Sequence, residues 1–188
     1  MKKFLLFVFT CLSLNTFAQG DIAYVRKVNF YGVDFSYANL FGWDDSPAAI
    51  KSELGKINNL FITQSKKYNV GKYFKKDVIS YCLKSTDKHN EKLSTKGLSS
   101  NTTYIELNDK QIRKIIADLS CTNDDYGLVF IAENLNKQDE KATYFVVFFN
   151  GSTKEIIYSK RASGKALGLG IRNHWAGSIY KMMKDWKY

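Results

Sequence analysis

The fold is decided by two apolar runs, Leu128-Val129-Phe130-Ile131-Ala132 and Tyr144-Phe145-Val146-Val147-Phe148-Phe149. Each run is apolar at successive positions, which is typical of central strands covered on both faces or nearly so. The polar stretch 134–141 between the runs predicts a hairpin. Asn150-Gly151 predicts a tight turn into a third strand over 155–163. The second half of the chain is therefore expected to contain a three-stranded meander.

Three segments around this meander predict helices. Ser46 suits an N-cap and Pro47 a first helical position, and the apolar residues that follow, to about residue 67, share one stripe. Asn108 and Gln111 resemble a capping box that opens a second helix. A closing helix is expected over 171–186, with Trp175 in its buried stripe.

Residues 24–38 alternate as a half-buried strand does, and residues 77–85 also predict a strand. The polar stretch 86–101 predicts a long exposed loop, and residues 102–107 a short strand or an extended lead-in. At 188 residues the chain suits one domain. We therefore expect a single α+β domain, in which a mixed, largely antiparallel sheet of about five strands carries three packed helices.

The first residues predict a secretory signal peptide over 1–18, followed by the domain at 19–188. Lys2 and Lys3 precede an apolar run, and Ala18 precedes a plausible cleavage site before Gln19. Cys11 raises a lipoprotein alternative, but the residues before it do not form a lipobox. No later stretch approaches about 20 apolar residues, so no transmembrane segment is expected in the mature chain. We expect Sec export to the periplasm or beyond.

The charge is strongly basic. The full chain has 28 Lys and Arg against 18 Asp and Glu, a net charge of +10, and loss of the two signal lysines leaves +8. Such a surface attracts anionic partners, or is simply solvated. No motif that reads RNA or DNA accompanies the lysines, so no specific nucleic acid is expected. High apolar and aromatic content excludes collagen, coiled coil and general disorder.

Cys82 and Cys121 remain after signal cleavage. In an oxidising compartment they could form a disulfide, and two buried free thiols are the alternative. There is no Cys-x-x-Cys pair, and neither His89 nor His174 has a spaced partner, so no metal site is expected.

The most distinctive candidate ligand-binding segment is rich in glycine and followed by a helix start. Glycines allow close backbone approach, and a helix start attracts anions. The spacing matches neither the dinucleotide-binding nor the Walker pattern. A structural connection that needs small residues is the alternative. The candidate residues are Gly164, Lys165, Gly168, Gly170, Arg172, Asn173 and His174.

Four weaker candidates have simpler explanations. His174 could act as a general base, but no local pattern ties a nucleophile to it. Asp44-Asp45 could hold a cation, or cap a helix. Glu133 lies beside a polar cluster that could form a recognition loop or solvate a hairpin. Phe41 and Trp43 could contact a partner or form a lid over the core.

Four stretches carry a resemblance to a known family: Phe17-Ala18-Gln19, Val33-Asp34-Phe35-Ser36-Tyr37-Ala38, Val146-Val147-Phe148-Phe149-Asn150 and the segment 164–176, with Arg172-Asn173-His174-Trp175-Ala176. In these stretches the chain resembles uncharacterised secreted proteins of Bacteroidota, a family without an assigned activity. The resemblance covers most of the mature chain. It implies an envelope or exported location and transfers no catalytic residue.

Taken together, these features predict an exported, non-enzymatic binding module whose partner is an anionic envelope component or another envelope protein. A structural or assembly subunit of the cell envelope, with Phe41 and Trp43 as contacts, is the first alternative. A hydrolase that uses His174 is the second. No catalytic residue, cofactor or metal is assigned from the sequence.

Overall fold

The computed structural model describes residues 22–93, 102–123 and 125–188. The expected signal peptide at 1–18 lies outside the described residues, as does the second half, 94–101, of the loop expected at 86–101. The strands are β1 (Lys27–Asp34), β2 (Asn39–Phe41), β3 (Asp77–Tyr81), β4 (Gly127–Asn136), β5 (Lys141–Phe149) and β6 (Ile156–Lys165). The helices are α1 (Pro47–Gly55), α2 (Leu60–Thr63), α3 (Val70–Phe74), α4 (Leu83–Glu91), α5 (Asp109–Asp118) and α6 (Gly170–Lys184), preceded by a 3-10 turn at Ile22–Tyr24.

The predicted mixed sheet and α+β class are confirmed. The main strand order is β3-β1-β4-β5-β6, and β2 also pairs with β4. The antiparallel meander β4-β5-β6 forms as expected. The sheet is less antiparallel than expected, however, because β1 lies between β3 and β4 and is parallel to both, as β2 is to β4. Parallel neighbours need long crossovers, and the segments that carry α1 to α3 and that carry α4 and α5 supply them.

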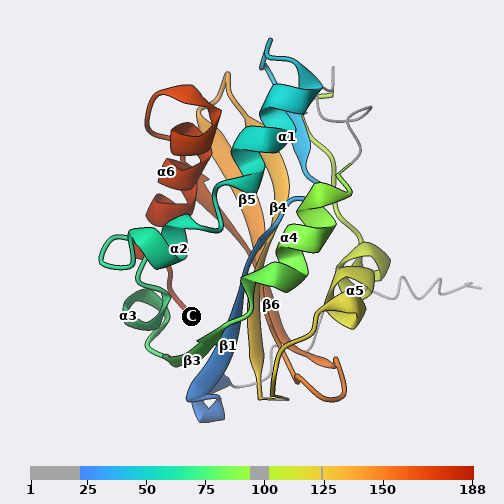
Figure 1. The fold of residues 1–188 in the computed structure, drawn as a ribbon, viewed down its shortest axis with the longest axis vertical. Helices are drawn as coiled ribbons and strands as arrows, with labels where there is room; N and C mark the ends of the chain where they lie inside the picture. The colour runs from blue at the N-terminus through green and yellow to red at the C-terminus, as the bar shows by residue number, and fades with distance from the viewer. Residues whose placement is uncertain (1–21, 94–101, 124) are drawn as a thin grey trace, which may run out of the picture.

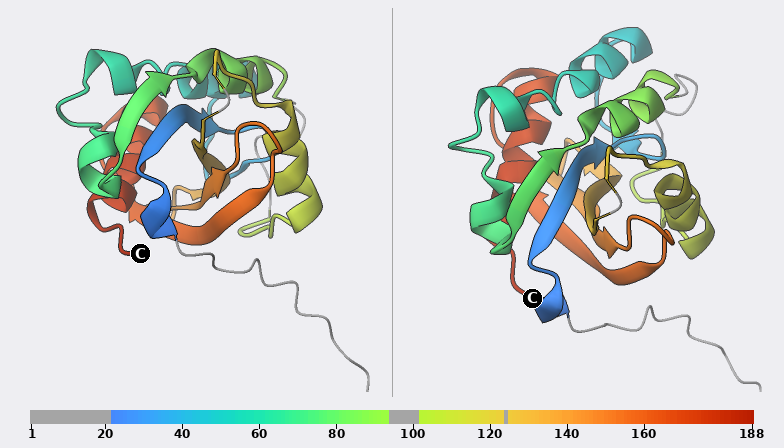
Figure 2. Two further views of the ribbon diagram at one scale, coloured as in Figure 1. Left: turned by 90° about the horizontal axis from the view of Figure 1, so that it is seen from below. Right: turned by 60° about the horizontal axis from the view of Figure 1, so that its bottom comes forward.

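Apolar side chains cover both faces of the central strands, which explains the continuous apolar runs. Alternate residues of β4 belong to different hydrophobic clusters. Phe130 packs in a cluster with residues of α1, α3 and α6, and Ile131 packs in a cluster with residues of α5. Figure 1 shows α1, α4 and α6 in front of the sheet. Figure 2 shows α5 on the other side of the strands from α6. β1 is buried along both faces too, rather than half-buried, because it is also a central strand.

The predicted caps and closing helix are confirmed. Ser46 accepts the backbone N–H of Ala49, and Asn108 and Gln111 form a reciprocal capping box. The helix expected over 46–67 is instead divided into α1 and α2, and α3 follows. Residues 102–107 form no strand. The largest difference is α4, which occupies residues expected to end a strand and begin a loop.

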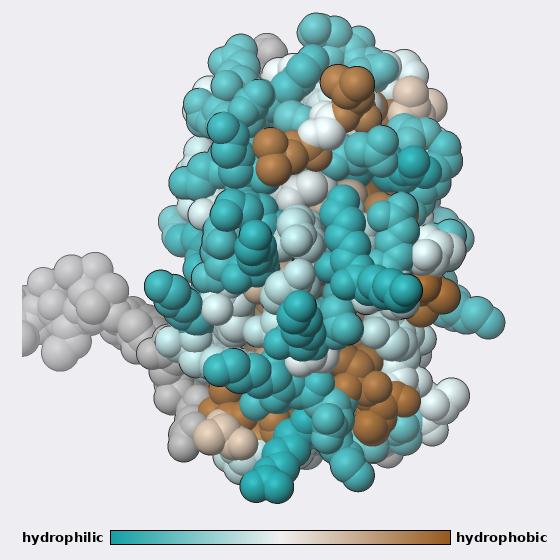
Figure 3. All heavy atoms as spheres, turned by 90° about the vertical axis from the view of Figure 1, so that its left-hand side faces the viewer, coloured by the Kyte–Doolittle hydropathy of each residue, from teal (hydrophilic) through white to brown (hydrophobic). Residues whose placement is uncertain are grey.

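The polarity of one outer face bears on whether the protein could dock there. The face that carries α2, α3 and α6 is largely hydrophilic, and its apolar patches are separate from one another (Figure 3). Within the described ranges, no helix has both the length and the apolar character that crossing a bilayer requires. Because the apolar patches in Figure 3 are separate, the face shown there offers no broad apolar docking surface.

Candidate functional site

A buried carboxylate stands at the carboxyl end of the central strand β1. Asp34 is fully buried. Its Oδ1 accepts the backbone N–H of Ser36 at 2.8 Å and also the Ser36 hydroxyl. Its Oδ2 lies 2.6 Å from Nδ1 of His89 on α4. Because ligands in sheets with parallel strands commonly bind beyond the carboxyl ends of those strands, the Asp34–His89 pair is in a favourable place for a site.

Asp34 keeps His89 protonated more readily than a free imidazole. The hydrogen bond with Asp34 raises the pKa of His89 above its usual 6.5. Burial of the ring opposes this rise, the charges of Asp34 and Asp118 add to it, and Lys92 opposes it. The His89 side chain is 15% exposed. The ring is therefore held by a buried partner and still reaches solvent.

His89 lines a cleft of about 630 Å³ between α4 and α5. Three lysines stand around the cleft: Lys88 and Lys92 on and just after α4, and Lys114 on α5. Asp118 is the carboxylate among the lining residues. Hydroxyl groups and one apolar side chain complete the lining, from Ser36, Tyr37, Ser85, Ser120 and Ile115. A cleft of this charge suits an anion.

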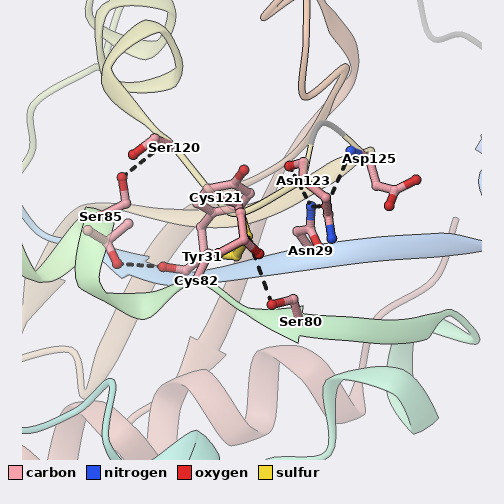
Figure 4. The surroundings of a disulfide bond; sticks show 11 residues. Asn29, Tyr31, Ser80, Cys82, Ser85, Ser120, Cys121, Asn123 and Asp125 are labelled. Atoms are coloured by element: carbon pink, nitrogen blue, oxygen red, sulfur yellow. Dashed lines mark hydrogen bonds between the residues drawn. A yellow bond between two sulfur atoms is a disulfide. The ribbon is translucent and has the colours of Figure 1, made fainter.

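One end of this cleft is cross-linked. Cys82, directly before α4, and Cys121, just after α5, form a disulfide with Cα atoms 5.5 Å apart. Beside it, the backbone N–H of Ser120 donates to the Ser85 hydroxyl oxygen at 3.0 Å (Figure 4). Of the two states that the sequence left open, the structure contains the disulfide. It joins the start of one cleft wall to the end of the other.

A second buried carboxylate, Glu133 on β4, has structural contacts. One of its oxygens accepts the backbone N–H of Leu107 at 3.0 Å and a guanidinium N–H of Arg161 at 2.9 Å. The other accepts the Thr143 hydroxyl at 3.1 Å. Arg161 also pairs with Glu106, whose side chain is 70% exposed. Glu133 is thus a buried anchor of the sheet rather than part of an exposed recognition loop.

We expect Glu133→Gln to lower the unfolding free energy by about 2 kcal/mol, because a buried charge-assisted hydrogen bond is lost and an amide donor is left unpaired. Glu106→Gln removes an exposed charge from the same arginine, and should change stability by less than about 0.5 kcal/mol. Urea denaturation of both variants measures the difference. Equal effects would show that burial of Glu133 contributes nothing.

The glycines of segment 164–174 serve the packing of α6. A Cβ on Gly164, which lies in β6, would stand 1.9 Å from the carbonyl oxygen of Ser178. Gly168 and Gly170 have φ values of +118° and +74°, which L-residues rarely adopt. These positions need glycine for the backbone, whether or not a ligand binds there.

The polar candidates of the same segment make separate contacts. Lys165 pairs with Glu140 at 3.5 Å, and Arg172 donates to the side chain of Asn173 at 3.3 Å. His174 Nδ1 lies 3.3 Å from the carbonyl oxygen of Gly168. Within the described residues, His174 has no carboxylate partner of the kind that His89 has.

The structure brings Trp43 and His174 together. Their ring centroids are 5.6 Å apart, and Trp43 also contacts Trp175 at 6.2 Å. Lys137 lies over the Trp43 ring. Phe41, in β2, and Trp43 are both half-buried. Trp43 thus packs over the start of α6, as the core-lid interpretation expects.

Sequence reasoning missed His89 and Asp34. His89 lies in the stretch 86–101, whose composition predicts a loop, and Asp34 lies in the stretch 24–38, whose alternation predicts a half-buried strand. The available signal was helical spacing, since Ser85, His89 and Lys92 recur at i, i+4 and i+7 and so share one face. A polar helix and a polar loop have similar compositions, so the helix can be recognised only when the strand that it packs against is known.

Comparison of the chain with models of protein families, with curated proteins and with solved structures finds no match. In the described part of the chain, no three His, Cys, Asp or Glu side chains cluster closely enough to hold a metal ion. The α4–α5 cleft is thus identified as the candidate site by its geometry.

Proposed function

We propose that this protein is an exported binding module that holds an anionic ligand in the α4–α5 cleft. The observation that carries the proposal is that Lys88, Lys92 and Lys114 line one cleft together with His89, whose ring is paired with the buried Asp34. Lysine side chains supply charge and hydrogen-bond donors, and the hydroxyls of Ser85 and Ser120 add further polar groups. Phosphate, sulfate and carboxylate groups are the ligands that this chemistry suits.

Export is part of the proposal and has independent support. Disulfides persist in oxidising compartments such as the periplasm, and the described chain contains the Cys82–Cys121 bond. The first eighteen residues have the pattern of a secretory signal. An anionic component of the cell envelope is therefore the partner class that we favour. The proposed binding site is the α4–α5 cleft, and not the glycine-rich segment that the sequence suggested.

The test is a thermal-shift titration of the purified protein with sodium phosphate and sodium sulfate at constant ionic strength, with glycerol as a neutral probe. An anion at 100 times its Kd should add about 2.7 kcal/mol and raise Tm by about 5–10 °C. The double variant Lys88→Gln/Lys114→Gln should weaken binding at least about tenfold, because two charge-assisted contacts are lost.

The matched control is Lys51→Gln/Lys66→Gln, which removes the same charge from α1 and from the turn after α2, outside the cleft lining. This control should bind the anions as the parent protein does. The absence of a saturable shift with either anion would overturn the proposal. An equal loss in the control pair would also overturn it, since the effect would then reflect net charge alone.

A further inference from the structure

We infer that the cleft is a proton-linked site for a doubly negative oxyanion, such as a phosphate monoester or a sulfate, with His89 as the proton-dependent donor. This inference rests on the proposed function and names the ligand class and the pH control of the same site. Two independent features carry it. One is the hydrogen-bond chemistry of the Asp34–His89 pair, and the other is the charge balance of the cleft.

The first feature is that only one ring nitrogen of His89, Nε2, is left to contact a ligand. Nδ1 faces Asp34 Oδ2 at 2.6 Å, so it carries the proton that this hydrogen bond requires. In the neutral ring the other nitrogen, Nε2, then has only a lone pair, which repels an anion. In the protonated ring Nε2–H becomes a donor. Asp34 therefore sets the tautomer so that His89 can donate to an anion only when it is charged.

The second feature is the charge balance. Lys88, Lys92 and Lys114 contribute three positive charges to the lining, and Asp118 contributes one negative charge. Protonated His89 and Asp34 compensate each other. The remaining excess is 3 − 1 = +2 among these lining groups, which matches a dianion better than a monoanion.

The hydroxyl groups contribute one clear donor. Ser85 Oγ accepts the backbone N–H of Ser120, so its own proton is available to a ligand. The Ser36 hydroxyl already donates to Asp34. An oxyanion in the cleft would thus meet a hydroxyl donor and an imidazolium donor from the same face of α4, since Ser85 and His89 are four residues apart.

The titratable groups around His89 come from three elements. Asp34 and Tyr37 belong to β1 and the turn after it, and Lys114 and Asp118 belong to α5. Lys88 and Lys92 lie on or directly after α4 itself. Asp34 and Asp118 favour protonation, and Lys92 disfavours it. The direction is a pKa above the usual 6.5, so the donor form persists toward neutral pH and is lost as the pH rises.

The experiment is isothermal titration with sodium sulfate between pH 5 and 9, because sulfate is a dianion over this whole range. Affinity should be constant at low pH and fall up to tenfold per pH unit once the pH exceeds the pKa of His89. Nitrate, a monoanion, should bind at least about tenfold more weakly than sulfate if the +2 excess selects charge. Glycerol 3-phosphate and vesicles containing phosphatidic acid then separate a free phosphate monoester from a lipid headgroup.

His89→Gln should bind sulfate weakly and with no pH dependence. His174→Gln is the matched control, because it removes the other histidine of the chain and should keep the pH profile. Sulfate binding that is flat with pH, or a profile that survives in His89→Gln, would overturn the inference and leave the proposed function standing. Equal affinity for nitrate would overturn the dianion assignment. Absence of anion binding at every pH would overturn the proposed function itself.

Discussion

Replacement of both bridged cysteines, Cys82→Ala/Cys121→Ala, should lower the unfolding free energy by about 4 kcal/mol. The bond closes a loop between positions separated by 39 residues. In the chain-entropy model, opening a loop of this length returns about that much conformational entropy to the unfolded chain. Urea denaturation of the variant and the parent protein measures the change. Mass spectrometry of the parent protein, with and without reduction, verifies the starting bond.

A reducing agent supplies the control for this prediction. It should lower the stability of the parent protein to that of the double variant, and leave the variant itself unchanged. Sulfate affinity should fall in parallel, because the bond joins the two walls of the proposed cleft at one end. A stability loss below about 1 kcal/mol would contradict the entropic argument. Unchanged sulfate affinity would show that packing alone positions α4 and α5.

The parts of the fold that sequence predicts are those whose signals are local. The apolar runs of β4 and β5, the capping box of α5 and the apolar stripe of α6 are each contained in a short window. Each of these elements forms where it was expected, except that β4 continues to Asn136, into the stretch expected as a hairpin. The split between α1 and α2 also follows Gly55, the last residue of α1, since glycine disfavours helix.

Helix α4 could not be predicted in this way, because polar contacts distant in sequence hold it in place. Asn90 accepts the backbone N–H of Phe35 at 2.7 Å and donates to the carbonyl of Val33 at 2.9 Å. Thr86 donates to the carbonyl of Tyr31. These side chains bond backbone groups of β1 and of the residue just after it, beyond Phe30, the last residue of β1 that pairs with β3. The local sequence of α4 does not indicate that β1 requires these hydrogen-bond partners.

The candidate site was missed for the same reason. Asp34 and His89 are separated by 55 residues and meet only because α4 crosses the end of β1. The glycine-rich segment is the candidate that sequence favours, because its pattern is contained in a short stretch. Its glycines have a sufficient explanation in the close approach of β6, the following loop and α6. The segment that is most distinctive in the sequence therefore has a structural role, whereas the charged cleft can be recognised only when the fold is known.

Gly164→Ala should destabilise the protein by about 3 kcal/mol or more. The added Cβ would lie 1.9 Å from the carbonyl oxygen of Ser178 and 2.8 Å from the backbone nitrogen of Met182. Both neighbours are backbone atoms of α6, so relief requires the helix to move away from β6, and overpacking against rigid neighbours is costly. Gly55→Ala is the control, since nothing lies within 4 Å of its added Cβ. It should be neutral or stabilising by up to about 1 kcal/mol.

Chemical denaturation of these two variants, combined with sulfate titration, separates the two interpretations of the glycine-rich segment. If its glycines serve architecture, Gly164→Ala loses stability, whereas Lys165→Ala/Arg172→Ala keeps parental sulfate affinity because both cations lie outside the α4–α5 cleft lining. If the segment is the anion site, the double variant loses sulfate binding and the Lys88→Gln/Lys114→Gln variant keeps it. A Gly164→Ala protein as stable as the parent would contradict the packing argument, since α6 would then have room to shift without loss of its contacts.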